Sequence, residues 1–294
     1  MRLAITAFAA VVATAVVTLL LPSPELRADW EVEQTRTLEE VLAFAAGAEH
    51  RLLVDNVLGS ITVSGHDRDD VRMVVRETIR GHAAADLERA RREVELAITS
   101  AEDGIRIFVD GPFRRADGSI EWRGDLGYEV VYDFELEVPV TLAAVLKTIH
   151  QGEIEARRLR GRLEISNVNG GITMEDVAGA GSIRTVNGEV AVSLVESPRE
   201  GWQFETVNGD VDVGFPADLS ADLRFRTFNG EVYTDFDFRP RRLDPPEPEH
   251  RDGRTIYRSA GHGVRIAAGN PSHPIPEMAF ATLNGNIYIR NHQR

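Results

Sequence analysis

Three acidic residues stand at the same position of a repeated phrase, and they are the first candidates for chemistry. Glu189, Asp210 and Glu231 each follow directly after an Asn-Gly pair. Stacked carboxylates could form a calcium ladder, because hard cations take several oxygen ligands, and two close carboxylates could serve a retaining glycosidase. The GGxGxDxUx pattern of calcium-binding β-rolls is absent, and none of the acids has a distinguished acid partner. We therefore interpret all three as solvated side chains beside turns and keep them only as candidates for surface binding.

Other residue types with catalytic or metal-binding chemistry lack the necessary spacing. The chain contains no cysteine, which excludes disulfides, zinc-thiolate sites and cysteine nucleophiles together. Its 8 histidines are scattered, and no HExxH motif occurs. Arginines between residues 157 and 162 could bind an acidic glycan or a lipid phosphate, but we favour a charged outer face. The sequence thus predicts no catalytic residue, no cofactor and no metal site.

The acids belong to an internal repeat that is anchored on Asn-Gly pairs, spaced 18, 21, 21 and 55 residues apart. The predicted structural turn residues are Asn169, Gly170, Asn187, Gly188, Asn208, Gly209, Asn229, Gly230, Asn284 and Gly285. Apolar residues recur four positions before the asparagine and three and five positions after it, with mostly polar residues between. This alternation on both sides of a turn signal predicts strand, turn and strand with one buried face. Weaker copies lie upstream, in "LVDNVLGSITV", where Leu58 replaces the asparagine, and in "QGEIEA".

Two architectures could use this repeat. In stacked hairpins each Asn-Gly pair would form a type I′ turn between antiparallel strands. In a parallel β-solenoid each repeat is one coil, and equivalent residues stack at roughly 4.8 Å. The columns favour the solenoid, because like residues then lie on like. We expect a mainly all-β fold, a parallel β-solenoid of two-strand coils, with threonine methyls turned inward and the asparagine amides stacked in a ladder.

The residue directly before each asparagine poses a separate question. Strict alternation would turn this apolar column outward. Its members are Val57, Val168, Val186, Val207, Phe228 and Leu283. We expect the corner geometry to fold these side chains in, and the alternative is an exposed stripe that docks the N-terminal segment or a partner.

The chain divides into regions that differ in their sequence patterns. Residues 1–28 are interpreted as a signal peptide or an N-terminal anchor. Residues 29–139 are predicted to form a β-rich region with one helix near 83–95, where alanine, leucine and opposite charges recur at helical spacing. Residues 140–294 carry the solenoid repeats, interrupted at 239–254 by a stretch rich in proline and charge that predicts an exposed loop or a disordered insertion. The final "MAFATLNGNIYIR" is predicted to be the last rung.

Composition and the N-terminus indicate where the protein acts. Met1 and Arg2 precede an apolar run from Leu3 to Leu21, the layout of a secretory signal, so we expect export to the periplasm, the cell surface or the medium. Retention of this segment as a membrane anchor stays open. The formal net charge is −14, which disfavours nucleic acid and anionic membrane surfaces as partners. Contact with a membrane is expected only through an uncleaved N-terminal segment.

The repeats resemble those of the bacterial putative-adhesin domains, a β-strand-repeat family of unknown function with coils of the form T-x-N-G-x-I-x-V. The resemblance extends from Arg51, at the "LLVDNVLGSITVSGHDRDDVRM" segment, to Arg290, after "TLNGNIYI". It implies an exported cell-envelope protein with a β-helical body and without catalytic residues. Our leading hypothesis is a non-enzymatic protein that binds an unknown envelope, glycan or protein partner. The alternative is a β-helix lyase or hydrolase that acts on an acidic polysaccharide, and it would need a groove with converging acid, base and arginine groups.

Overall fold

The computed structural model describes residues 16–18, 30–47, 49–115, 118–121, 126–237, 239–241, 249–251, 254–256, 262–267 and 275–292. Within these residues the chain is mainly β, with two large mixed sheets and one helix, α1 (Ala84–Glu93). The first sheet consists, in spatial order, of β1 (Val16–Thr18), β2 (Val32–Ala43), β5 (Asp70–Gly81), β8 (Tyr128–Pro139), β4 (Ile61–His66), β10 (Ile154–Arg157), β12 (Ile172–Val177), β14 (Val190–Leu194), β16 (Val211–Phe215), β24 (Ile287–Asn291) and β18 (Val232–Thr234). The second sheet consists of β19 (Arg239–Arg241), β22 (His262–Ala267), β17 (Ser220–Arg226), β23 (Glu277–Ala281), β15 (Trp202–Glu205), β13 (Ala180–Arg184), β11 (Arg162–Ser166), β9 (Ala143–Lys147), β3 (Arg51–Asp55), β7 (Gly104–Asp110) and β6 (Glu95–Ala101). The short strands β20 (Glu249–Arg251) and β21 (Arg254–Ile256) pair with each other.

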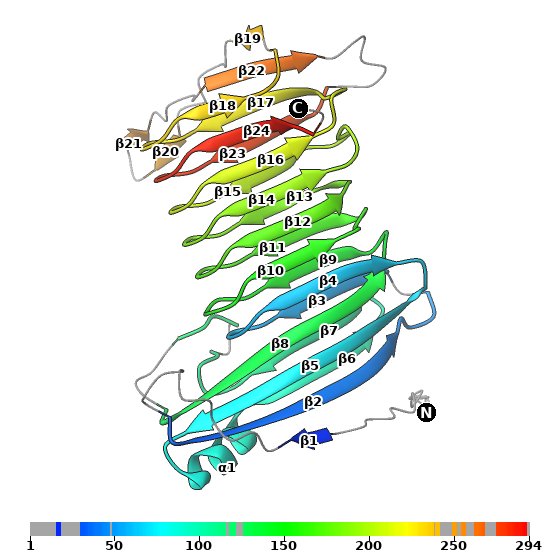
Figure 1. Ribbon diagram of the computed structural model, residues 1–294, viewed down its shortest axis with the longest axis vertical. Coiled ribbons are helices and arrows are strands. Elements are labelled where there is room, and N and C mark those ends of the chain that lie inside the picture. The colour runs from blue at the N-terminus through cyan, green and yellow to red at the C-terminus, as the bar shows by residue number, and fades with distance from the viewer. Residues whose placement is uncertain are drawn as a thin grey trace.

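The repeats alternate between the two sheets. A strand of the second sheet leads through an Asn-Gly corner, or its equivalent, into a strand of the first sheet, and we call this unit a rung (Figure 1). Successive rungs pair in parallel and in register, so that Ile172 is the partner of Val190 and Val190 the partner of Val211. This is the pairing expected of stacked repeats, whereas hairpins would give antiparallel partners.

The columns of the repeat form the core between the sheets. Ile172, Val190, Val211 and Ile287 are all 0% exposed and stack on one another across four strands. On the facing sheet aromatic rings stack from rung to rung as well, for example Phe204 on Phe280 with centroids 5.2 Å apart. Burial of apolar area at about 25 cal/mol per Å² makes this shared interior the main stabilising contribution.

The last rung of the sequence does not lie last in the stack. β23 pairs with β15 on one side and with β17 on the other, and β24 lies in the same way between β16 and β18. The C-terminal rung is therefore inserted between two rungs that precede it in the chain, which corrects the prediction that it ends the stack. The columns permit this exchange, because every rung presents the same inward residues to its neighbours.

The N-terminal region is built from longer, antiparallel strands. β2, β5 and β8 pair antiparallel, and β8 then pairs in parallel with β4, the first strand of the repeats in this sheet (Figure 1). Asp133 on β8 accepts hydrogen bonds from the backbone N–H (3.0 Å) and hydroxyl (2.8 Å) of Ser60. Burial alone would raise the pKa of Asp133, but these bonds and Arg76 lower it below its usual range. The acid thus ties the first corner of the repeats to the antiparallel region.

The helix lies inside the range predicted for it. Asp86 accepts a hydrogen bond from the backbone N–H of Ala83 and so satisfies one donor of the helix N-terminus. Leu87 and Ala90 form its buried face against β2, β5 and β8. A β-branched C-cap residue with extended geometry, Val94, ends the helix and begins the run into β6.

Several segments differ from the sequence predictions. The ambiguous residues 32–43 form a strand, β2, whose partner β5 supplies the pairing that the local pattern did not reveal. Most of the predicted leader 1–28 lies outside the described residues, but residues 16–18 within it form β1, which pairs with β2. Within the predicted insertion 239–254, β19, β20 and the first residue of β21 replace loop, and residues 242–248 and 252–253 are not described. No helix among the described residues has the length and apolar character needed to cross a membrane.

A buried polar group stabilises the interior of the N-terminal region. Glu77 is 3% exposed, and its carboxylate accepts hydrogen bonds from the Arg36 guanidinium and from the Tyr132 hydroxyl at 2.8 Å. Tyr132 is 1% exposed, and its burial and the neighbouring Glu77 raise the pKa of its hydroxyl. Removal of either donor would leave a buried carboxylate with too few partners, which is costly.

Stability should fall at high pH because of this tyrosine. An unfolded tyrosine ionises near its ordinary value of 10.0, whereas folded Tyr132 keeps its proton above that value. Its contribution is therefore complete below about pH 10 and is lost as the pH rises through the folded pKa, by up to about 1.4 kcal/mol per pH unit. Thermal melts between pH 8 and 11.5 should show this decline, and the slope should be shallower in Tyr132→Phe. Equal slopes in the two proteins would contradict the assignment.

Candidate functional site

The predicted turn residues lie at the rung corners, where they form two ladders of hydrogen bonds. Each asparagine amide donates to the amide oxygen of its neighbour in the stack, for example Asn208 to Asn187 at 2.8 Å and Asn284 to Asn208 at 2.7 Å. Asn187 donates likewise to Asn169, and Asn229 to Asn284. In the second ladder the threonine two positions before the asparagine donates to a glycine carbonyl of the adjacent rung, as Thr206 does to Gly188 at 2.9 Å. The corner is therefore a structural device.

The asparagine ladder ends on a histidine that the repeat pattern did not identify. His150 occupies the asparagine position in the rung formed by β9 and β10, and it pairs with Leu58 of the preceding rung. The Asn169 amide nitrogen lies 3.2 Å from the imidazole Nδ1 of His150. The imidazole thus takes the place of a further asparagine amide at this end of the ladder. The signal in the sequence was the 19-residue distance from His150 to Asn169, close to the 18-residue period.

The corner glycines are required by close backbone contact. A Cβ on Gly188 would lie 2.2 Å from the Gly170 carbonyl oxygen, and one on Gly209 would lie 2.1 Å from the Gly188 carbonyl oxygen. Gly209 also has a φ of +153°, which residues with side chains rarely adopt. The stacking distance of the sheets leaves no room for a methyl group at this position.

The acids after the glycines do not form a continuous carboxylate column. Because the C-terminal rung is inserted, Asn286 lies between Asp210 and Glu231 in the stack. Asp210 accepts a hydrogen bond from the backbone N–H of Asn286 at 2.7 Å, and Asn286 in turn accepts one from the N–H of Glu231 at 3.0 Å. Glu189 is exposed. No cluster of three potential metal-binding side chains occurs among the described residues.

The apolar column before the asparagines is partly exposed, against our expectation. Val57 is 2% exposed at the start of the stack, but toward its far end Val186, Val207, Leu283 and Phe228 are 38%, 36%, 46% and 78% exposed. The corner therefore does not fold these side chains inward. Phe228 belongs to the rung of β17 and β18, and β18 is the outermost strand of the first sheet, so fewer neighbours cover it.

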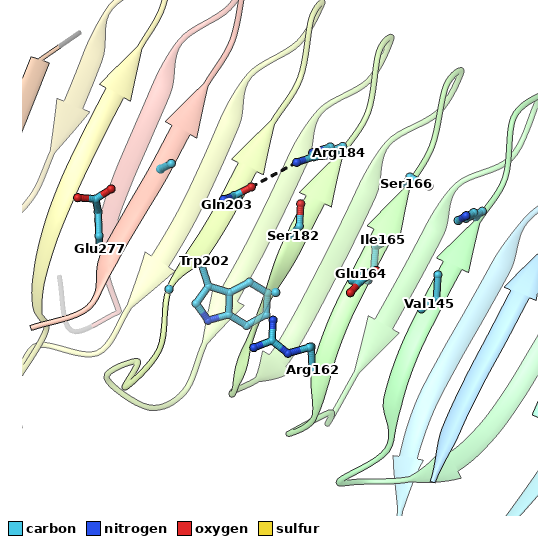
Figure 2. Close-up of a pocket in the computed structure, with 14 residues that line it drawn as sticks. Val145, Arg162, Glu164, Ile165, Ser166, Ser182, Arg184, Trp202, Gln203 and Glu277 are labelled. Carbon is cyan, nitrogen blue, oxygen red and sulfur yellow. Dashed lines mark hydrogen bonds between the residues drawn. The ribbon is translucent and has the colours of Figure 1, made fainter. Parts of the chain in front are cut away.

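A groove lies on the outer face of the second sheet, at the described strands β9, β11, β13, β15 and β23 (Figure 2). Its volume is about 530 Å³. Four lining residues form one row across neighbouring strands, in the order Glu164, Ser182, Gln203 and Ala279. In this row the small residues Ser182 and Ala279 alternate with the longer Glu164 and Gln203. The hollow arises where these short side chains stand between long charged ones, so it runs across the strands, along the stack.

Charged side chains surround this groove. Arg184 makes an ion pair with Glu205 at 3.1 Å and donates a hydrogen bond to Gln203 at 3.3 Å, drawn in Figure 2. Arg162 pairs with Glu200 at 3.2 Å, with both side chains more than 60% exposed. Exposed pairs of this kind contribute little to stability and exchange readily for a ligand. Lys147 and Glu164 make no ion pair with the described part of the chain.

The groove does not place its two acids as a glycosidase would. Glu164 and Glu277 lie on β11 and β23, which are separated by three strand spacings. Three spacings are about 14 Å, beyond the roughly 5–9.5 Å that separates the catalytic carboxylates of retaining and inverting enzymes. Neither acid was predicted as a site residue, and neither were the small residues beneath them. Of the four arginines at 157–162, only Arg162 lines the groove.

The chain was compared with known proteins. No protein-family model matches it, and no curated protein does either. A putative cell adhesion protein from Clostridium sporogenes has a solved structure that aligns with 86% of this chain and 98% of its own, at 12% identity and a TM-score of 0.43. A putative lipid binding protein and a putative adhesin, both from Parabacteroides distasonis, align with 87% of this chain and 96% of their own, at 10% and 9% identity and TM-scores of 0.27 and 0.20. TM-scores below 0.5 do not establish a shared fold, so the adhesin resemblance stays a prediction.

Replacement of a corner glycine should separate the rungs. Gly209→Ala places a methyl group against the Gly188 carbonyl, and we expect a loss of at least ~2 kcal/mol in the free energy of unfolding, or roughly 4–8 °C in Tm. The matched control is Gly171→Ala, because a Cβ there would lie 3.4 Å from its nearest described neighbour, the Glu189 carbonyl oxygen. Urea and thermal unfolding should show a large loss for the first variant and a change within about 0.5 kcal/mol for the second. Similar losses in both would count against the close-contact explanation.

Proposed function

We propose that the protein is an exported, non-enzymatic binding protein of the cell envelope, built as an adhesin-like parallel β-solenoid. We further propose that the groove on its second sheet binds an extended, hydroxyl-rich polymer, a glycan. The observation that carries the proposal is the groove itself, which has small residues at its floor and exposed polar side chains at its sides. The N-terminal layout of charge followed by an apolar run supports export.

The repeat geometry favours a polymer over a compact ligand. The groove crosses rungs at intervals of about 4.8 Å, so it offers similar small residues and polar groups again and again along the stack. A chain of sugar units repeats its hydroxyl groups in the same manner and can make one set of hydrogen bonds at several positions. Weak contacts repeated in this way add to a useful affinity through multivalency.

The charges of the groove specify the glycan further. Lys147, Arg162 and Arg184 contribute three positive charges against the two negative charges of Glu164 and Glu277. Arg162 and Arg184 are already paired with Glu200 and Glu205, which leaves Lys147 as a lining cation without an ion pair in the described part of the chain, and we propose that it receives a carboxylate of the glycan. Serine, glutamine and the acids supply acceptors and donors for neutral hydroxyl groups.

Binding is favoured over catalysis because of the distances within the groove. The two acids of the groove are too far apart to act as the carboxylate pair of a hydrolase. The cations could neutralise the carboxylate of an acidic sugar, as a polysaccharide lyase requires, so a lyase is the second candidate. Product formation decides between them, because a lyase shortens its polymer and a binding protein does not.

The test compares two tryptophan variants of one rung. Ser182→Trp places a large side chain in the groove, whereas Ala191→Trp places the same side chain on the outward face of β14, in the first sheet of the same rung. Ala191 pairs there with Thr173 and Asp212. We expect the wild-type chain and Ala191→Trp to bind the same glycans on an array and on whole bacteria, and Ser182→Trp to bind at least ~10-fold more weakly, a loss of about 1.4 kcal/mol.

Three outcomes would overturn parts of this proposal. The absence of glycan binding by the wild-type chain would remove the proposed ligand. Equal binding by Ser182→Trp would move the site away from the groove. Release of shortened or unsaturated products from an acidic polysaccharide would replace the binding protein with a lyase.

A further inference from the structure

A second hollow lies where the N-terminal region meets the first rungs, apart from the groove. It has a volume of about 320 Å³ and is formed by the end of α1, β7 and the segment after it, the start of β8 and the corners at Leu58 and His150. Its walls are mainly apolar side chains that belong to the core, among them Val57, Val94, Val109 and Phe113, each no more than 7% exposed. It is the kind of concave, apolar and preformed space that binds small molecules.

The volume sets the size of the ligand. An engineered apolar cavity of about 150 Å³ binds one benzene molecule, and this hollow of about 320 Å³ is roughly twice as large. If each methylene takes about the volume that a water molecule takes in the liquid, roughly 30 Å³, the hollow accommodates an alkyl chain of about ten carbons.

The polar groups around the hollow determine which head group the bound alkyl chain can carry. They are mostly engaged already: the Tyr128 hydroxyl donates to Glu93 at 2.7 Å, and Glu129 pairs with Arg80 at 3.1 Å. His150 receives the last amide of the asparagine ladder. The Gln151 side chain is exposed at the edge of the hollow and offers an amide donor and acceptor.

Charge disfavours an anionic head group. The described residues around the hollow include an acid, Glu129, and neither lysine nor arginine. Glu129 is already paired with Arg80, so the described lining offers no cation to a carboxylate or phosphate head group, whereas a hydroxyl or amide head group can bond to Gln151. An apolar chain with a neutral, hydrogen-bonding end fits both the walls and the mouth.

We propose that this hollow is a binding site for a neutral, single-chain amphiphile with an alkyl chain of about ten carbons, such as a medium-chain alcohol or amide. The site is independent of the glycan groove, since the two share no lining residue. The protein would then carry two ligands of opposite polarity, one on the outer face of the stack and one where the stack begins.

The first experiment measures chain-length dependence. Calorimetric titration of the full chain with n-alkanols from hexanol to tetradecanol should show a Kd that falls about fourfold for each added methylene. The decrease should stop near ten carbons, where the hollow is full. Decanoate should bind more weakly than decanol. No binding of any alkanol, or affinity that rises without a break to tetradecanol, would overturn the site, and tighter binding of decanoate would overturn the neutral head group.

The second experiment fills the hollow. Val130 lines it and packs against the core, while its neighbour Val131 does not line it. Because Val130 lines the hollow and Val131 does not, Val130→Trp should fill the space and Val131→Trp should leave it open. We expect decanol affinity to fall at least ~10-fold in the first variant and within twofold in the second, with circular dichroism to confirm folding. Equal decanol affinity in two folded variants would refute the location of the site. If Val130→Trp does not fold, the dependence of Kd on alkanol length in the wild-type chain tests the site instead.

Discussion

The structure depends on the close approach of one corner backbone to the next. At four of the five Asn-Gly corners the glycine N–H donates to the asparagine carbonyl of a neighbouring rung, as Gly188 does to Asn208 at 3.0 Å and Gly209 to Asn284 at 3.0 Å. This contact sets the stacking distance, and the other features follow from it: the sheets pair in register, the inward residues form columns, and the amide and threonine ladders come within hydrogen-bonding distance. A side chain at the glycine would disturb all of them together.

The antiparallel region gives the stack a fixed beginning. Its long strands lie side by side, and the last of them, β8, pairs with β4 (Figure 1). The register of β8 therefore fixes that of β4, of β10 beside it and of the later rungs of the first sheet. The buried Glu77 with Arg36 and Tyr132 holds the three long strands together across one row, because its partners stand directly opposite on β2 and β8. Such a fully bonded charge specifies one alignment of the strands, since a shift by one residue would leave it without donors.

The parts of the fold that could be predicted are those that the period of the chain encodes. The columns at Ile172, Val190 and Val211 identify strands, buried face and parallel register, since residues that repeat must stack on their equivalents. The helix was predictable from its local spacing. The position of the C-terminal rung was not, because rungs with identical columns can exchange places without loss of packing. The strand β2 was ambiguous because its pattern acquires meaning only against β5.

The two hollows were beyond prediction for different reasons. The groove exists because of residues that are small, such as Ser182 and Ala279, and an absence of side-chain volume gives no motif. The apolar hollow combines segments that are distant in the chain, such as Val109 and His150, whose types suit an ordinary core. The acids after the glycines had a clear pattern and yet serve the corner, because repetition alone produces aligned charges.

The interleaved C-terminal rung has a consequence for how the chain folds. A stack of repeats can grow outward by adding one unit after another, with each new unit resting on a finished one. Here β17 and β18 precede their parallel neighbours β23 and β24 in the chain, so the contacts of β23 with β15 and β17 can form only once residues 277–291 are available. Strands β23 and β24 close contacts on both sides at once, and the long sequence separation of these contacts slows this step.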